Sequence, residues 1–66
     1  MNLVDYYRHK VKILADNGRS FVGFVSDYIW PDENENGKES IIIDTDNIAN
    51  GIEFYADDIV SIEILD

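Results

Sequence analysis

The sequence predicts a mainly β protein, in which a short N-terminal helix is followed by a strongly bent, five-stranded antiparallel barrel. Three observations lead to this fold class. Asn17-Gly18 separates two runs of alternating apolar residues, Gly23 lies inside the second run, and three further apolar runs follow, each after a group of turn residues. Short strands separated by turn residues are typical of small all-β sandwiches and barrels.

The length of 66 residues predicts a single domain, residues 1–66, with a small core. A chain of this size buries only about 60% of the surface that its unfolded form exposes, so a cross-link or a partner often adds stability. Disulfides and the usual zinc sites are excluded, because the sequence has no cysteine and a single histidine. A compact barrel and self-association remain as sources of stability.

Residues 2–10 predict the N-terminal helix. Asn2 can cap its first turn, and the charges of Asp5 and Arg8 lie where the helix dipole favours them. The apolar face of this helix, expected to cover one end of the barrel, comprises Leu3, Val4 and Tyr7.

Apolar and polar residues then alternate over residues 11–15, which predicts a half-buried strand. Asn17-Gly18 predicts a two-residue type I′ hairpin turn, because both central positions of that turn need positive φ. The second strand covers residues 19–30. Gly23 inside this strand indicates a sharp bend, which would allow one strand to serve both sheets of a barrel.

The rest of the chain predicts three more strands. Residues 31–38 are a polar loop that contains a second turn signal, Asn36-Gly37. Strands are expected at residues 40–43, 52–55 and 59–65, with turn residues over 44–51. This pattern predicts a small closed or nearly closed barrel, in which closure protects the strand edges from unwanted pairing.

Charge is distributed unevenly along the chain, whose net charge is −9. Residues 1–19 contain four basic and two acidic residues, a net of +2, whereas residues 20–66 contain one basic and twelve acidic residues, a net of −11. Such a surface repels a polyanion over most of its area. Either the acidic residues simply keep a small protein soluble, or they favour a basic or neutral partner.

One stretch resembles the first half of the Sm and Sm-like motif, with alternating apolar residues, an Asp/Asn-Gly turn, an aromatic residue and a glycine. It reads Val11-x-Ile13-x-Ala15-Asp16-Asn17-Gly18-Arg19-x-Phe21-x-Gly23-x-Val25. Residues 52–62 are similar to the second half, with Ala56 as its small turn residue. The resemblance covers nearly the whole chain and implies a bent, SH3-like, five-stranded barrel. It also implies subunits that pair the fourth strand of one copy with the fifth of the next, often in rings.

The Sm-like family commonly binds RNA, and here the sequence departs from the family pattern. Ile29 stands where RNA-binding members carry an aspartate, and Tyr55 stands where they carry an arginine. Tyr55 can still stack on a base. If RNA is bound, the residues expected to contact it are Arg8, Lys10, Lys12, Arg19 and Tyr55.

The stretch Tyr28-Ile29-Trp30 predicts exposed apolar surface, because strand alternation cannot turn all three side chains inward. Either Tyr28 and Trp30 complete the core, or one of them anchors a protein contact, a role in which aromatic residues are enriched. The residues expected at a protein contact are Tyr28, Ile29, Trp30 and Tyr55.

Two further patterns are candidates for chemical sites. Asp32-x-Asn34-x-Asn36-Gly37 matches the first half of a calcium-binding loop, but position 12 of such a loop is here Ile43 and not a bidentate glutamate. A plain turn is expected, with Asp32, Asn34 and Asn36 as a weak calcium alternative. The acidic residues Asp44, Asp46, Asp57 and Asp58 show no spacing typical of a catalytic pair, and His9 has no partner in a known motif.

The sequence thus predicts a non-catalytic assembly or interaction module without a cofactor, self-associating through edge strands and binding a protein partner. The alternatives are an Sm-like RNA-binding protein and an acidic mimic of nucleic acid. No apolar run approaches the roughly 20 residues that cross a bilayer, and residues 1–5 lack signal-peptide features. A cytoplasmic protein without a membrane partner is expected.

Overall fold

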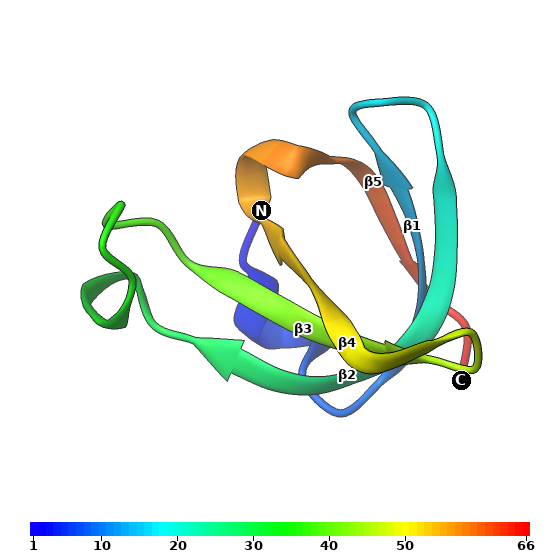
Figure 1. The fold of residues 1–66 in the computed structure, drawn as a ribbon. Helices are drawn as coiled ribbons and strands as arrows, with labels where there is room; N and C mark the ends of the chain where they lie inside the picture. Colours follow the sequence, from blue (N-terminus) through cyan, green and yellow to red (C-terminus); the bar gives the residue numbers. More distant parts are fainter.

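The computed structural model describes residues 1–66 and is mainly β, as predicted (Figure 1). Its five strands are β1 (Lys10–Ala15), β2 (Ser20–Ile29), β3 (Ser40–Thr45), β4 (Ile48–Tyr55) and β5 (Ile59–Ile64). Three short 3₁₀-helices accompany them, namely η1 (Leu3–Tyr6), η2 (Pro31–Glu33) and η3 (Ala56–Asp58).

The strands form one curled antiparallel sheet in the order β4-β3-β2-β1-β5. β4 pairs only with β3 and β5 pairs only with β1, so the sheet has two free edges and the barrel is not closed. The expectation of closure is therefore not met. The short η3 joins the two edge strands, and they diverge from it across the opening (Figure 1).

The N-terminal segment is a single 3₁₀ turn and not the helix predicted over residues 2–10. Asn2 makes no side-chain cap, Arg8 adopts a φ of 70°, and β1 already begins at Lys10. The helix prediction is wrong because the backbone of this segment bonds to β2 and not within a helix. The Arg8 amide donates to the Val25 carbonyl oxygen at 2.9 Å.

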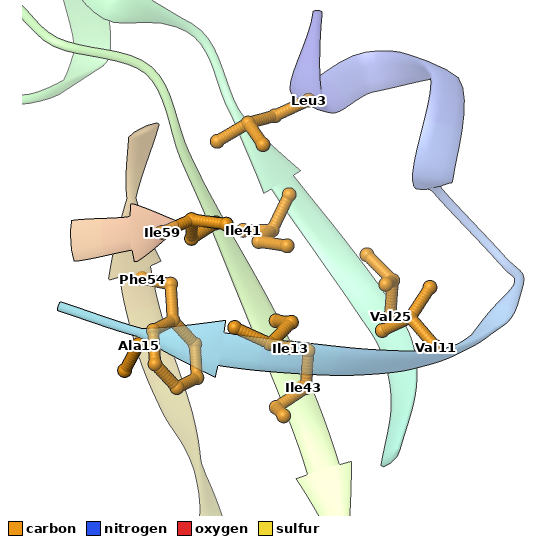
Figure 2. Close-up of a cluster of buried hydrophobic side chains, with 9 residues drawn as sticks. All are labelled: Leu3, Val11, Ile13, Ala15, Val25, Ile41, Ile43, Phe54 and Ile59. Carbon is orange, nitrogen blue, oxygen red and sulfur yellow. The ribbon is translucent and has the colours of Figure 1, made fainter. Parts of the chain in front are cut away.

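The 3₁₀ turn also changes which side chains of this segment face inward. Residues three apart eclipse one another in a 3₁₀-helix, so Leu3 and Tyr6 share a face. Leu3 is fully buried at one end of the core (Figure 2). Tyr6 packs against the core. Val4 and Tyr7, expected on the covering face, are exposed.

The Asn17-Gly18 hairpin forms, but with a three-residue loop in place of the predicted two-residue type I′ turn. The Ala15 carbonyl accepts the Gly18 amide at 3.0 Å, and the Ala15 amide donates to Arg19 at 2.8 Å. Gly18 has a φ of 85°, whereas Asn17 stays at negative φ. This is a type I turn followed by a left-handed glycine. The Asn17 Oδ1 atom stabilises it by accepting the Arg19 amide at 2.9 Å.

Gly23 lies at the bend in β2, as predicted. β2 pairs with β1 through residues 20–24 and with β3 from Phe24 onward, so the strand changes partners at this point (Figure 1). A Cβ atom on Gly23 would lie 2.4 Å from the Asp44 carbonyl oxygen. Only glycine allows the backbone of β3 to approach so closely.

The connection between β3 and β4 is shorter than the turn predicted over residues 44–51. β3 runs to Thr45 and β4 begins at Ile48, with a register shift between Ile43 and Thr45. The turn residues at 49–51 therefore form an irregular stretch inside β4. Polar and glycine residues mark a bulge as readily as a turn, which explains the misplaced boundary.

The core lies inside the curl of the sheet and takes residues from all five strands (Figure 2). It comprises Leu3, Val11, Ile13, Ala15, Val25, Ile41, Ile43, Phe54 and Ile59. The Phe21 and Phe54 rings meet edge to face at 5.3 Å on one side of this core. Ala56, the predicted small turn residue, is the first residue of η3 and packs against the core.

Candidate functional site

The two free edges of the sheet are the first candidate site. In β5, Val60 is 61% exposed and Ile64 is 42% exposed, and Ile48 is exposed at the start of β4. Neither edge strand contains lysine, arginine or proline, and each has a single charged residue, Glu53 in β4 and Glu63 in β5. The guards that these edges do carry are one glutamate on each strand, the irregular stretch of β4 and the register shift between β1 and β5, so the straight part of β5 remains open to another strand.

The ladder shows which backbone groups of β5 face outward. The Leu65 amide donates to the Lys10 carbonyl at 2.8 Å, and Ile64 stands opposite Val11. Because hydrogen-bonding direction alternates along an antiparallel strand, the amides of Ile62 and Ile64 point away from β1. β5 therefore offers unpaired donors and acceptors beside exposed apolar side chains.

The second candidate site is a shallow depression of about 250 Å³, here called the aromatic depression. Its lining is Val4, Tyr7, Asp27, Tyr28 and Trp30. Trp30 is 55% exposed, and its ring lies 5.0 Å from that of Tyr28 at an interplanar angle of 89°. The two rings therefore form a corner on the surface of the protein.

Hydrogen bonds hold Tyr28 in place within the aromatic depression. The Tyr28 hydroxyl donates to Glu39 Oε1 at 2.9 Å, and the Leu3 amide donates to the same oxygen at 3.2 Å. Burial raises the pKa of Tyr28, and the hydrogen bond and charge of Glu39 raise this pKa further. Glu39 thus ties the N-terminal turn to the end of β2.

The sequence predicts only part of the aromatic depression. Tyr28 packs against the core, as one of the two expectations for this stretch has it, whereas Trp30 is exposed. Ile29 is half-buried and does not line the depression. The sequence places Val4 and Tyr7 on the face of a helix that covers the barrel. The alternation of residues in β2 therefore does not predict that these two side chains line the depression.

Tyr55 lies apart from the aromatic depression. It is half-buried at the end of β4, where its amide donates to Asp58 Oδ2 at 2.9 Å. The ion pair of Lys38 with Asp57 joins the nearby loop to η3. This pairing raises the pKa of Lys38, first through the hydrogen bond and then through the charge of Asp57.

The basic residues expected to contact RNA are only partly brought together. Lys10 and Lys12 stand opposite Phe24 and Val22 on the outer face of β1 and β2, and the Arg8 guanidinium lies 5.3 Å from the centre of the Phe24 ring. Arg19 instead packs over Phe21, and Tyr55 lies on β4. Acidic residues flank the basic cluster, with Glu63 opposite Lys12 and Asp44 opposite Phe24.

The candidate calcium loop uses its side chains internally. Asn36 Oδ1 accepts the Lys38 amide at 3.0 Å, and Asn34 Nδ2 donates to the Lys38 carbonyl at 2.7 Å. Gly37 adopts a φ of 71°, so Asn36-Gly37 repeats the turn geometry of Asn17-Gly18. Asp32 lies in η2 and is exposed. No three acidic or histidine side chains gather as metal ligands.

His9 pairs with the carboxylate of Asp66, Nδ1 to Oδ1 at 2.9 Å. The Lys10 amide donates to the other oxygen of Asp66 at 3.0 Å. The Lys10 amide, followed by His9, lowers the pKa of Asp66. These contacts hold Asp66 beside the start of β1.

Comparisons with protein-family models, with curated proteins and with solved structures return no match to the chain. None of the helices in the structure is long and apolar enough to cross a membrane.

Proposed function

We propose that the chain is a non-catalytic, Sm-like assembly and interaction module that self-associates through its edge strands and binds a protein partner. One observation carries the assembly half of the proposal: the strand order leaves β4 and β5 each with an unpaired side. Exposed apolar residues line the β5 edge, and neither edge carries a lysine, arginine or proline guard.

Pairing β4 of one copy with β5 of the next satisfies both edges at once. This contact is heterologous, so a series of copies closes into a ring or continues as a filament. The resemblance to the Sm-like motif implies the same pair of strands at the subunit contact. Pairing in this way would also bury apolar surface that the 66-residue chain leaves exposed as a single copy.

The partner-binding half of the proposal rests on charge and exposed aromatic residues. A net charge of −9 attracts basic partners and repels polyanions. Trp30 and Tyr7 are exposed, and tryptophan and tyrosine are enriched at the energetic centres of protein interfaces.

Light scattering coupled to size-exclusion chromatography, over a wide range of protein concentration, tests the assembly. We expect a mass that is a fixed multiple of the 7.6 kDa chain. Ile64→Pro removes an outward amide while leaving the β1 ladder intact, so its mass should fall toward that of one copy. A wild-type protein that stays monomeric at the highest concentration would contradict the assembly half.

Single-stranded RNA binding is the second candidate, favoured by Arg8 and Lys10 beside Phe24 and by Lys12 opposite Val22 on the same outer face. Bases stack on aromatic rings and cations hold phosphates, so this outer face has the right residue types. The acidic remainder of the surface opposes it. Fluorescence anisotropy of labelled RNA at low salt separates the two, because the assembly proposal predicts no binding even at roughly tens of micromolar protein.

A further inference from the structure

We infer that the aromatic depression binds the cationic head group of a lysine or arginine side chain from a basic protein partner. This inference rests on the partner-binding half of the proposed function and is independent of the edge-strand assembly. It names the site on this chain and the chemistry of the group that enters it.

The lining of the depression has the composition of a cation site. Three of its five residues are aromatic, and the only charged one is the acid Asp27. Organic cations are attracted to the faces of tryptophan and tyrosine rings, and sets of such rings recognise ammonium groups in proteins. A cation would pair with the exposed carboxylate of Asp27, which a purely apolar ligand cannot do.

The geometry of the depression suits a single side chain. The perpendicular rings of Tyr28 and Trp30 supply two walls, and Val4 and Tyr7 from the N-terminal turn complete the lining. The volume of about 250 Å³ lies below the usual range for small-molecule pockets, which begins near about 300 Å³. One head group and part of its aliphatic stem are therefore a better match than a larger ligand.

The site is preorganised before any ligand arrives. The hydroxyl of Tyr28 is held by Glu39, and Asp27 Oδ1 accepts the Tyr28 amide at 2.8 Å. Asp27 is nevertheless exposed, so its negative charge stays available to a ligand. Ordering costs that would weaken binding are thereby reduced.

Acidic residues close in sequence to the lining favour a cation as well. Asp5 follows Val4 in the chain, and Asp32 and Glu33 follow the Trp30-Pro31 step, and all three acids are exposed. The nearest basic residue in sequence, Arg8, is engaged over Phe24, which does not line the depression. No lysine or arginine of the chain itself lines the site.

The single tryptophan of the chain lies in the depression, so its fluorescence reports binding directly. The probe is a short glycine-flanked peptide with one central lysine, titrated into the millimolar range at constant ionic strength. The control is the same peptide with norleucine, which keeps the stem and removes the charge. We expect a saturable change with the lysine peptide and a norleucine peptide weaker by about fivefold or more.

Two matched variants separate local recognition from general attraction. Asp27→Asn keeps an oxygen that accepts the Tyr28 amide but removes the charge, and should weaken lysine-peptide binding by about three- to tenfold. Asp44→Asn removes one charge from an exposed residue outside the depression and should weaken binding by less than about twofold.

Three results would overturn the inference. Equal binding of the norleucine peptide would mean an apolar docking surface, and equal weakening by both variants would mean attraction to the overall charge only. The absence of any saturable change would remove the site altogether. Light scattering on the same samples keeps the two proposals distinct, because a monomer that binds the lysine peptide contradicts assembly and leaves this inference standing.

Discussion

The central strand β3 and the edge strand β5 are built from the same kinds of residue but differ in how many of these residues are covered. Ile41 and Ile43 in β3 are fully buried, with β2 and β4 on either side. Val60 and Ile64 in β5 are largely exposed. β-Branched residues favour strands at both places, so propensity alone does not set burial. The face on which a residue lies and the cover that its strand receives decide burial together, because Phe54 and Ile59 are buried on edge strands while Val22 is exposed on the interior strand β2.

The largest expected effect comes from truncating an isoleucine at the centre. Ile41→Ala leaves a cavity and should lower the free energy of unfolding by about 2–5 kcal/mol. Ile64→Ala at the edge should cost less than about 1 kcal/mol within a single copy, because little apolar contact is lost there. Urea denaturation of both variants at one protein concentration measures the difference. Equal losses would mean that the edge is covered in solution to the same degree as the centre.

The bend in the central strand should be nearly as sensitive. Gly23→Ala places a methyl group against the Asp44 carbonyl and should cost about 3 kcal/mol. Gly18→Ala at the hairpin serves as the control, since nothing lies within 4 Å of its Cβ position and only the φ of 85° is unfavourable. The free energy of unfolding of this control variant should fall by about 1 kcal/mol. Thermal unfolding of the two variants tests the order, and a smaller loss at Gly23 would contradict the close approach.

A charge on the edge should change assembly more than stability. Val60→Lys places on β5 a lysine of the kind that protects natural edge strands from pairing. The variant should therefore have a lower mass by light scattering than the wild type. Val22→Lys is the matched control, because Val22 is also an exposed valine but lies on the interior strand β2. Its mass should equal that of the wild type. If both variants dissociate equally, net charge and not edge pairing controls the assembly.

The smallest expected effect is the pH dependence contributed by Asp66. Its pKa in the folded state lies below the ordinary value of 3.8, mainly because the Lys10 amide donates to the carboxylate. The stability from this contact is therefore present above about pH 3.8 and is lost as the pH falls through the lower, folded-state pKa. The side chain is exposed, so the change is small.

Asp66→Asn retains an acceptor for the Lys10 amide but cannot titrate. The free energy of unfolding, measured between pH 2 and pH 7, should therefore fall less steeply below pH 4 in this variant than in the wild type. Glu35→Gln, in the exposed loop and without a hydrogen bond in the structure, makes the same change in charge and should not flatten the acid limb to the same degree.

Local patterns predict the strands well and the turn geometry less well. Gly23 is identifiable as the bend, because a glycine inside an apolar run usually marks a bend or a close approach of another backbone. Asn17-Gly18 is identifiable as a hairpin, yet the loop contains three residues and not two. A positive φ at glycine satisfies both turn types, and the register that distinguishes them depends on how β1 and β2 pair.

The candidate sites are predictable in part for a similar reason. Trp30 is recognisable as a candidate contact residue from the alternation of β2 alone. Tyr7 joins it in the aromatic depression only because the N-terminal segment forms a 3₁₀ turn and exposes that side chain. Among the basic residues, Lys10 and Lys12 share a face by strand periodicity, whereas Arg19 is separated from them by its position at the hairpin.

The sequence by itself determined the mainly β class, the five strands, the Gly23 bend and the acidic surface, because these follow from residue type and spacing along the chain. Three features could be known only from the folded chain: the barrel stays open, β4 and β5 are its free edges, and Tyr7 and Trp30 line one depression. Each of these depends on contacts between segments far apart in the sequence. Such contacts are set by competition among strand pairings, which local propensity does not encode.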